Sequence, residues 1–231
     1  MSALLSLLLM LSVFLISALP HSLNNLSHHH HHQQELLLRF KAAVSKNGTS
    51  LADWTPLHPF LCNWTGVTCH SSFHTVRAIN LTLMSLNGTI SPVLGNLSSL
   101  RSIDLSGNYL TGTIPPQLGQ LPHLRTLLLY GNQLKGTIPP TLSACRNLHF
   151  LALSYNQLHG SIPPELSLLT NLKYLYLASN ILTGTIPPSF ENLSALVILD
   201  LGMNELYGTI PWEIGDKLSN LVSIYLNGKS A

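Results

Sequence analysis

A pattern of 24 residues repeats through the middle of the chain and limits what the chain can fold into. Four columns of identical residues keep this spacing over five repeats. The columns are Asn108, Asn132, Asn156, Asn180 and Asn204; Leu110, Leu134, Leu158, Leu182 and Leu206; Gly112, Gly136, Gly160, Gly184 and Gly208; and Ile114, Ile138, Ile162, Ile186 and Ile210. One repeat is too short to bury its own leucines, so it needs a neighbour on each side. The period therefore predicts a solenoid of stacked coils.

Each repeat also contains two apolar residues separated by one other residue, which is the alternation of a short strand. The pairs are Ile103 and Leu105, Leu127 and Leu129, Leu151 and Leu153, Leu175 and Leu177, and Leu199 and Leu201. These side chains are expected to point into the coil, and stacked coils should pair the strands in parallel, about 4.8 Å apart. The asparagine column then falls in the turn after each strand. An amide both donates and accepts, so we interpret these asparagines as structural partners of buried backbone groups.

After each asparagine the chain reads close to x-Leu-x-Gly-x-Ile-Pro-Pro. Glycine allows a backbone bend that a Cβ would resist, and the proline pair should end strand pairing. Together, L-x-x-L-x-L-x-x-N-x-L and L-x-G-x-I-P-P resemble the plant-specific class of leucine-rich repeats. The resemblance covers about residues 34 to 228. It implies an α/β solenoid, a right-handed superhelix with short parallel strands on its concave face.

Residues 34–74 depart from the repeat and are predicted to form an N-terminal cap. Leu37, Phe40 and Val44 fall on one helical face, and the stretch Cys62-Asn-Trp-Thr-Gly-Val-Thr-Cys69 follows. This stretch resembles the capping module of plant receptor ectodomains, which covers the apolar end of the first coil. In a secreted chain the two cysteines should form a disulfide, and zinc would need further ligands at suitable spacing.

The remaining residues, 75–231, are predicted to form a leucine-rich-repeat domain of about six to seven repeats. In its first repeat, Met84 replaces the asparagine, and Cys145 stands in a leucine column, where we expect a buried apolar role. The last coil is displaced by one residue after Trp212 and should present an open apolar end. We expect a truncated product, a gene fragment or a chain whose last coil a partner covers.

The first part of the chain suggests a secretory route. Residues 1–20 are apolar and begin at the terminus, which suits a signal peptide, with an uncleaved anchor as the alternative. Residues 21–33 are predicted to be a His-rich linker, with a metal site or an introduced tag as the other interpretations of its histidine run. Seven N-x-Ser/Thr sequons predict N-glycosylation. They are Asn25, Asn47, Asn63, Asn80, Asn87, Asn96 and Asn192.

Aromatic residues gather at positions predicted to point outward from the middle coils. The candidate ligand-binding residues on the concave face are Tyr130, Phe150, Tyr155, Tyr174 and Tyr176, with Asp200 as a charge at the rim. One of the predicted outward columns comprises Ser106, Tyr130, Ser154, Ala178 and Gly202. Clustered exposed aromatics are typical interface anchors, and the alternative is cross-strand stacking that only stabilises the sheet.

Charge and motifs exclude several classes of function. The 231 residues carry a formal charge of +2 without basic runs, which argues against nucleic acid as the partner. The chain lacks the glycine-rich phosphate loop, the kinase motifs, H-E-x-x-H and G-x-S-x-G. We therefore expect no enzyme activity, no cofactor and no metal site.

As a whole, the chain resembles the N-terminal part of a plant leucine-rich-repeat receptor-like kinase ectodomain, especially in the subfamily that recognises microbial peptides. The resemblance implies an extracellular module, at the cell surface or in the apoplast, that binds a peptide or protein ligand, with a co-receptor ectodomain as a further candidate partner. The kinase of such receptors is absent from this sequence. The alternatives are a secreted inhibitor of cell-wall polygalacturonases and a truncated decoy without activity of its own.

Overall fold

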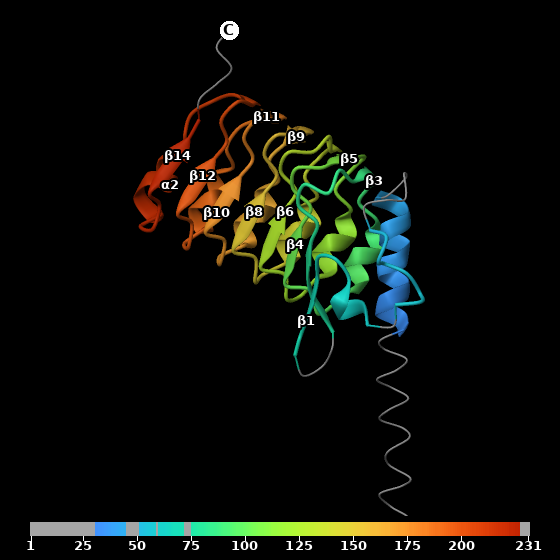
Figure 1. Ribbon diagram of the computed structural model, residues 1–231. Coiled ribbons are helices and arrows are strands. Elements are labelled where there is room, and N and C mark those ends of the chain that lie inside the picture. Colours follow the sequence, from blue (N-terminus) through green and yellow to red (C-terminus); the bar gives the residue numbers. More distant parts are fainter. Residues whose placement is uncertain (1–30, 45–50, 59, 72–74, 227–231) are drawn as a thin grey trace, which may run out of the picture.

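The computed structural model describes residues 31–44, 51–58, 60–71 and 75–226, which form a curved stack of coils (Figure 1). The predicted signal peptide, most of the His-rich linker and the sequons at Asn25 and Asn47 lie outside the described residues. The helical residues 31–44 stand at one end of the stack, and the strands succeed one another toward the other end.

One sheet runs the length of the stack. Within the described residues it has eight strands in the order β1-β2-β4-β6-β8-β10-β12-β14. These are β1 (Val67–Cys69), β2 (Val76–Asn80), β4 (Ser102–Asp104), β6 (Thr126–Leu128), β8 (Phe150–Ala152), β10 (Tyr174–Tyr176), β12 (Ile198–Asp200) and β14 (Ser223–Tyr225). All pairs from β2 to β14 are parallel and stay in register, so that Ile103 lies beside Leu127 and Leu175 beside Leu199. The predicted parallel solenoid is confirmed.

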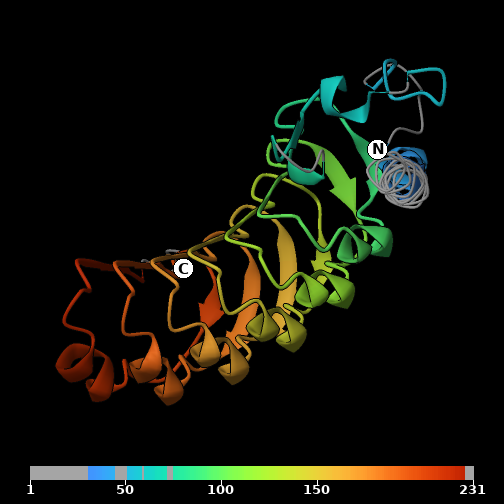
Figure 2. The ribbon, with the colours of Figure 1, turned by 90° about the horizontal axis from the view of Figure 1, so that it is seen from below.

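The core lies between this sheet and a row of short helices. Both members of each predicted inward pair are buried, and they join one continuous apolar cluster that extends from the cap to Leu218. The helices are η2 (Pro92–Asn96), η3 (Pro116–Gln120), η4 (Pro140–Ala144), η5 (Pro164–Leu168) and η6 (Pro188–Asn192), all of the 3-10 type. Each begins at a proline, which needs no amide partner in the first turn. Figure 2 shows them along the outer curve of the stack, opposite the large sheet.

The one-residue displacement near the end of the chain has a local cause. In place of a five-residue 3-10 helix, the last described coil contains α2 (Trp212–Lys217), a six-residue α-helix. The extra residue is therefore absorbed on the convex side. Beyond it, β14 still pairs in register with β12, and Leu199 lies beside Ile224.

Further short strands follow the asparagine turns. β7 (Lys135–Gly136), β9 (Gln157–Ser161), β11 (Ile181–Gly184) and β13 (Glu205–Leu206) form a second parallel sheet, and β3 (Asn87–Thr89) pairs with β5 (Tyr109–Thr111). The repeat glycine is required here. Gly136 has φ +84°, and a Cβ on it would come within 2.9 Å of the Thr113 methyl group of the preceding coil. The glycine bend is thus confirmed, whereas this second sheet was not predicted.

The asparagine column forms a hydrogen-bonded ladder between coils. Asn132 Nδ2 donates to the Leu105 carbonyl of the preceding coil and the Leu129 carbonyl of its own coil, both at 3.0 Å. Its Oδ1 accepts the Leu110 N–H at 3.0 Å. The same three kinds of bond recur at the other four positions, as for Asn156 with Leu129, Leu153 and Leu134. The structural role predicted for these asparagines is confirmed.

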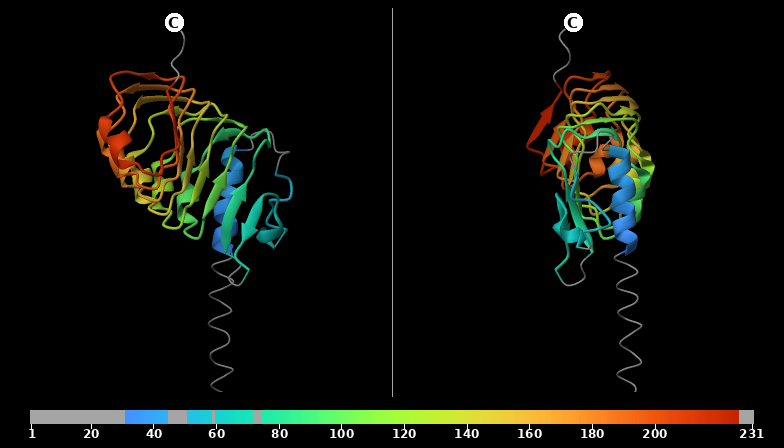
Figure 3. Two further views of the ribbon diagram at one scale, coloured as in Figure 1. Left: turned by 90° about the vertical axis from the view of Figure 1, so that its left-hand side faces the viewer. Right: turned by 45° about the vertical axis from the view of Figure 1, so that its right-hand side comes forward.

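The N-terminal cap closes the first coil. Leu37, Phe40 and Val44 of the helical residues 31–44 are fully buried, and Phe40 packs against Trp54, with ring centroids 6.2 Å apart. The Cys62–Cys69 disulfide joins η1 (Leu61–Asn63) to β1, which pairs antiparallel with β2. Figure 3 shows this cap beside the first strands of the large sheet. The disulfide predicted from the sequence is confirmed.

Cys145 is buried and unbridged, as its place in the leucine column predicts. Its thiol donates to the Leu118 carbonyl at 3.3 Å. Burial, which disfavours the thiolate, raises the pKa of Cys145 to about 11.

The ladder makes a testable statement about stability. The substitution Asn132→Ala leaves the Leu110 N–H and three carbonyls without their amide partner, so the free energy of unfolding should fall by about 3 kcal/mol. Urea denaturation followed by circular dichroism measures this loss. Asn147→Ala is the matched control, because its exposed amide makes one bond, to the Pro122 carbonyl, and its loss should cost less than about 1 kcal/mol. Equal losses in both variants would contradict the importance of the ladder.

The buried thiol predicts a pH dependence. The folded-state pKa of Cys145 lies above the ordinary thiol value of about 8.5, so its contribution to stability is complete below that value and is lost as the pH rises toward 11. Stability measured by denaturation should therefore fall more between pH 8.5 and 11 in the parent chain than in Cys145→Ala. A thiol-specific reagent should also label Cys145 only after unfolding. Rapid labelling of the folded chain would show that the thiol is accessible.

Candidate ligand-binding surface

Three aromatic side chains form a contact cluster on the large sheet. Phe150 begins β8, and Tyr174 and Tyr176 are the ends of β10. The Phe150 ring centroid lies 5.1 Å from that of Tyr174 and 5.5 Å from that of Tyr176. The two tyrosine rings are nearly parallel, at 6° and 6.5 Å. We call these three residues the aromatic cluster.

The strand register explains why these side chains meet. Phe150 and Tyr174 are register partners in β8 and β10, and strand side chains alternate between the two faces. The next residue in each strand, Leu151 or Leu175, is fully buried. The aromatic rings therefore lie on the opposite face of the sheet, which is the solvent-exposed concave face. All three rings are partly exposed.

A polar rung continues from this cluster toward the last coil. Tyr176 is paired in register with Asp200, and Asp200 with Tyr225. Partial burial raises the pKa of Tyr176, and Tyr174, Asp200 and Tyr225 add to this rise. At neutral pH the Tyr176 phenol is a hydrogen-bond donor, on the strand next to the one that carries the Asp200 carboxylate.

The other two predicted aromatics lie beyond the strands. Tyr130 is two residues past the end of β6 and is 41% exposed. Tyr155 is three residues past the end of β8, has φ +57° and is 65% exposed. The structure therefore brings together three of the five candidates, with Asp200 beside them, and places Tyr130 and Tyr155 in the turns that follow the strands.

The outward column predicted through Tyr130 is wrong at its other members. Ser106, Ser154, Ala178 and Gly202 are buried. Alternation between faces holds only within a strand, and these residues follow the strand ends, where the chain turns inward toward the asparagine ladder. The Ser106, Ser154 and Ala178 carbonyls accept bonds from the Asn108, Asn156 and Asn180 amides.

A column of basic residues at the start of the strands was missed. Four members directly precede the first residue of a strand, and the fifth, Arg77, is the second residue of β2. The members are Arg77, Arg101, Arg125, His149 and Lys173, and we call them the basic column. Their 24-residue spacing in the sequence would have predicted the column, because residues at this spacing lie side by side in stacked coils.

The described sequons all lie at exposed asparagines. Asn96 and Asn192 end η2 and η6 on the convex side, where attached glycans would leave the large sheet free. Asn80 ends β2 on the sheet itself, and its side chain accepts bonds from the Thr82 N–H and hydroxyl. Asn63 and Asn87 belong to η1 and β3.

Comparison with known families agrees with this architecture. A family model described as a leucine-rich-repeat N-terminal domain matches residues 30–70, and a leucine-rich-repeat model matches residues 98–158 and 170–229, more than half of the chain. A second repeat model, of two copies, matches residues 146–189. The solved structure of a Pollen Receptor Kinase 3 is 35% identical, with a TM-score of 0.73, over 84% of this chain and 93% of that one. The chain belongs to the leucine-rich-repeat family of plant receptor ectodomains.

Two further relatives are receptors of which this leucine-rich-repeat chain matches only a part. It is 48% identical over 66 residues to the LRR receptor-like serine/threonine-protein kinase EFR of Arabidopsis thaliana, a match covering 28% of this chain and 6% of that protein. It is 34% identical to the ectodomain of the Arabidopsis receptor kinase GASSHO1/SCHENGEN3, solved in complex with Casparian strip integrity factor 2. That alignment has a TM-score of 0.68 and covers 85% of this chain and 27% of the other. The chain thus corresponds to only a small part of the curated relative's length.

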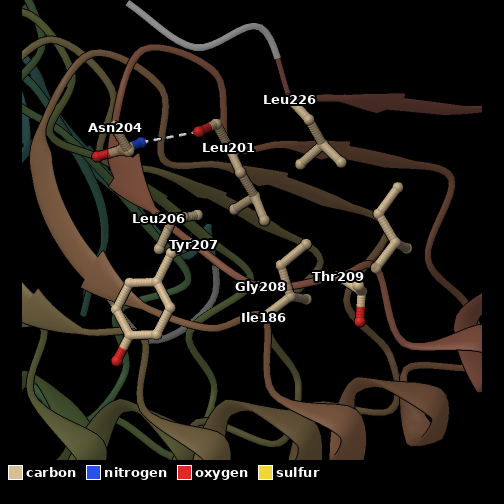
Figure 4. Close-up of a pocket in the computed structure, with 9 residues that line it drawn as sticks. Ile186, Leu201, Asn204, Leu206, Tyr207, Gly208, Thr209 and Leu226 are labelled. Atoms are coloured by element: carbon tan, nitrogen blue, oxygen red, sulfur yellow. Dashed lines mark hydrogen bonds between the residues drawn. The ribbon is translucent and has the colours of Figure 1, made fainter.

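The last described leucine-rich-repeat coil is less covered than the others. The repeat isoleucine is 6% exposed at Ile186 but 50% exposed at Ile210. A hollow of about 160 Å³ lies there, and Leu201, Leu206 and Leu226 from neighbouring coils border it (Figure 4). The Asn204 amide, also at this hollow, donates to the Leu201 carbonyl.

The described residues contain neither a cluster of metal-binding side chains nor a membrane-spanning helix. No three histidine, cysteine or acidic side chains in that part of the chain come together as a metal site would require. None of its helices combines the length and hydrophobicity needed to cross a bilayer.

Proposed function

We propose that this chain is an extracellular recognition module that binds a peptide ligand on its concave sheet, without chemistry of its own. The observation that carries the proposal is the aromatic cluster of Phe150, Tyr174 and Tyr176, partly exposed on the concave face of the large sheet. Large, rigid aromatic side chains lose little entropy on binding and are enriched among interface anchors. Relatives with the same fold include receptor ectodomains, one of them solved with a bound factor.

The polar rung beside the cluster gives the surface a second kind of contact. Asp200 supplies a carboxylate and Tyr176 a phenol donor, both at the edge of the aromatic cluster. A peptide that places an apolar side chain on the rings would bring its backbone amides within reach of these groups. This combination of an apolar anchor with polar groups at its border is the usual anatomy of a protein interface.

Selection from a random-peptide phage library tests this proposal. The full chain should enrich binding peptides, and the Tyr174→Ala/Tyr176→Ala variant should bind the same peptides at least about tenfold more weakly, because each lost anchor costs more than about 1 kcal/mol. Tyr109→Ala is the matched control, since Tyr109 is an exposed tyrosine in β5, outside the large sheet. Its affinity should equal that of the parent chain.

Thermal unfolding of the same variants separates binding from stacking. Cross-strand aromatic pairs contribute about 0.2–1 kcal/mol each to a sheet, so a small loss of stability is expected in the double variant. If stability falls and peptide affinity does not, the cluster only stabilises the sheet. If no peptide is enriched while the chain inhibits a polygalacturonase in proportion to its concentration, the peptide-binding proposal is overturned.

A further inference from the structure

The basic column is a line of basic side chains built by the stacking of coils. The backbone N–H of Arg101 donates to the Arg77 carbonyl at 2.7 Å, and that of Arg125 to the Arg101 carbonyl at 2.8 Å. His149 and Lys173 continue the series, each donating to the preceding member. The members are therefore one coil apart, roughly 4.8 Å at the backbone. Four of the chain's eleven lysines and arginines belong to this one column.

No carboxylate neutralises this line within the described residues. The ion pairs found there join Arg39 to Glu35 and Lys217 to Glu191, away from the column. The carboxylates of the large sheet lie at the other ends of the strands. Asp104 accepts bonds from the Ser106 N–H and hydroxyl, and Asp200 accepts the Gly202 N–H. Like charges on adjacent strands repel one another, so the column does not serve stability.

The first three members of the column border a hollow. It measures about 270 Å³ and is lined by Arg77, Arg101 and Arg125 together with the neighbouring residues Ala78, Ser102 and Thr126. Thr68 and Cys69 of the cap strand β1 form one end of it. Three arginines, whose guanidinium groups each carry five donors, thus share this hollow with the hydroxyl-bearing residues Thr68, Ser102 and Thr126.

The column also leads to the aromatic cluster. His149 directly precedes Phe150, and Lys173 directly precedes Tyr174. A ligand that crosses the coils from the hollow toward β10 therefore meets arginines first and then aromatic rings with His149 and Lys173 alongside. An extended peptide rises about 3.3 Å per residue, so about three residues span the two steps from Arg77 to Arg125.

We propose that the basic column, centred on Arg101 and Arg125, binds an acidic segment of an extended peptide whose apolar side chains rest on the aromatic cluster. Arginine pairs with carboxylate through two parallel hydrogen bonds, which fixes orientation as well as charge. The basic column is one residue wide, and its last members lie beside the aromatic cluster. This arrangement suits a single extended peptide whose side chains alternate. This inference rests on the proposed function and adds the chemical class of the ligand.

The test uses the same phage selection on the full chain. Peptides selected by the parent chain should be richer in Asp and Glu than the starting library, and those selected by Arg101→Gln/Arg125→Gln should not be. A synthetic acidic peptide from the first pool should bind the double variant about 10- to 100-fold more weakly, as expected for the loss of two charge-assisted contacts. Its affinity for the parent chain should fall as salt is raised.

Arg39→Gln/Lys135→Gln is the matched control. It also removes two positive charges, but at exposed residues outside the large sheet, one in the cap and one in β7. Its affinity should stay within about twofold of the parent value, because rim charges far from a contact act weakly through screened fields. An equal loss in this variant would show that only net charge matters, which overturns the proposal.

The outcomes distinguish the two proposals. If selected peptides depend on Tyr174 and Tyr176 but not on Arg101 and Arg125, the surface binds peptides and the acidic class is wrong. If no peptide is selected by the parent chain, both proposals fail. Polygalacturonate is the competing polyanion. If it binds the parent chain more tightly than the acidic peptide and loses affinity in Arg101→Gln/Arg125→Gln, the column binds a polysaccharide and the peptide assignment is overturned.

Discussion

The stack depends on the hydrogen bonds that the asparagine amides make at each turn. A coil must change direction after its strand, and the turn leaves buried carbonyl and N–H groups without a partner in the sheet. One amide in each coil donates to three carbonyls and accepts one N–H, drawn from its own coil and the coil before it. Because the bonds cross between coils, the same interaction that permits the turn also keeps the strands in register.

That regularity leaves one face of the sheet free for recognition. Inward positions are filled by leucine and isoleucine, and the glycine bend and the proline-initiated helices return the chain to the next strand. Outward positions carry no such constraint, so aromatic rings, carboxylates and cations occupy successive coils there. Since register brings residues 24 apart into contact, any preference repeated at that spacing becomes a continuous stripe. The aromatic cluster and the basic column are such stripes, adjacent on one surface.

Prediction from the sequence succeeded where the period is strict. Cys145 was assigned to the core by its column alone, and the structure buries it. The prediction failed where the alternation of strand side chains was extended beyond the end of a strand. Ser154, two residues after β8, is buried in the turn. The second sheet was missed because its strands are short and either contain the repeat glycine or end just before it, and glycine usually weakens a strand. The basic column was missed because its members are far apart in sequence, and a search for runs of charge does not detect them.

The sequence by itself determined the repeat, the buried columns, the asparagine ladder and the paired cysteines of the cap. The first three follow from local spacing and from the need to bury apolar groups and satisfy polar ones, whereas the cysteine pair follows from the resemblance to a capping module and from the expected secretory route. Tertiary structure alone decided which outward side chains meet. Phe150 reaches Tyr174 and Tyr176, while Tyr130 and Tyr155 lie in turns, and Arg101 stands between Arg77 and Arg125 at the edge of a hollow. The reason is that contact between outward residues depends on register and on the backbone direction at each strand end, which only the stacked coils establish.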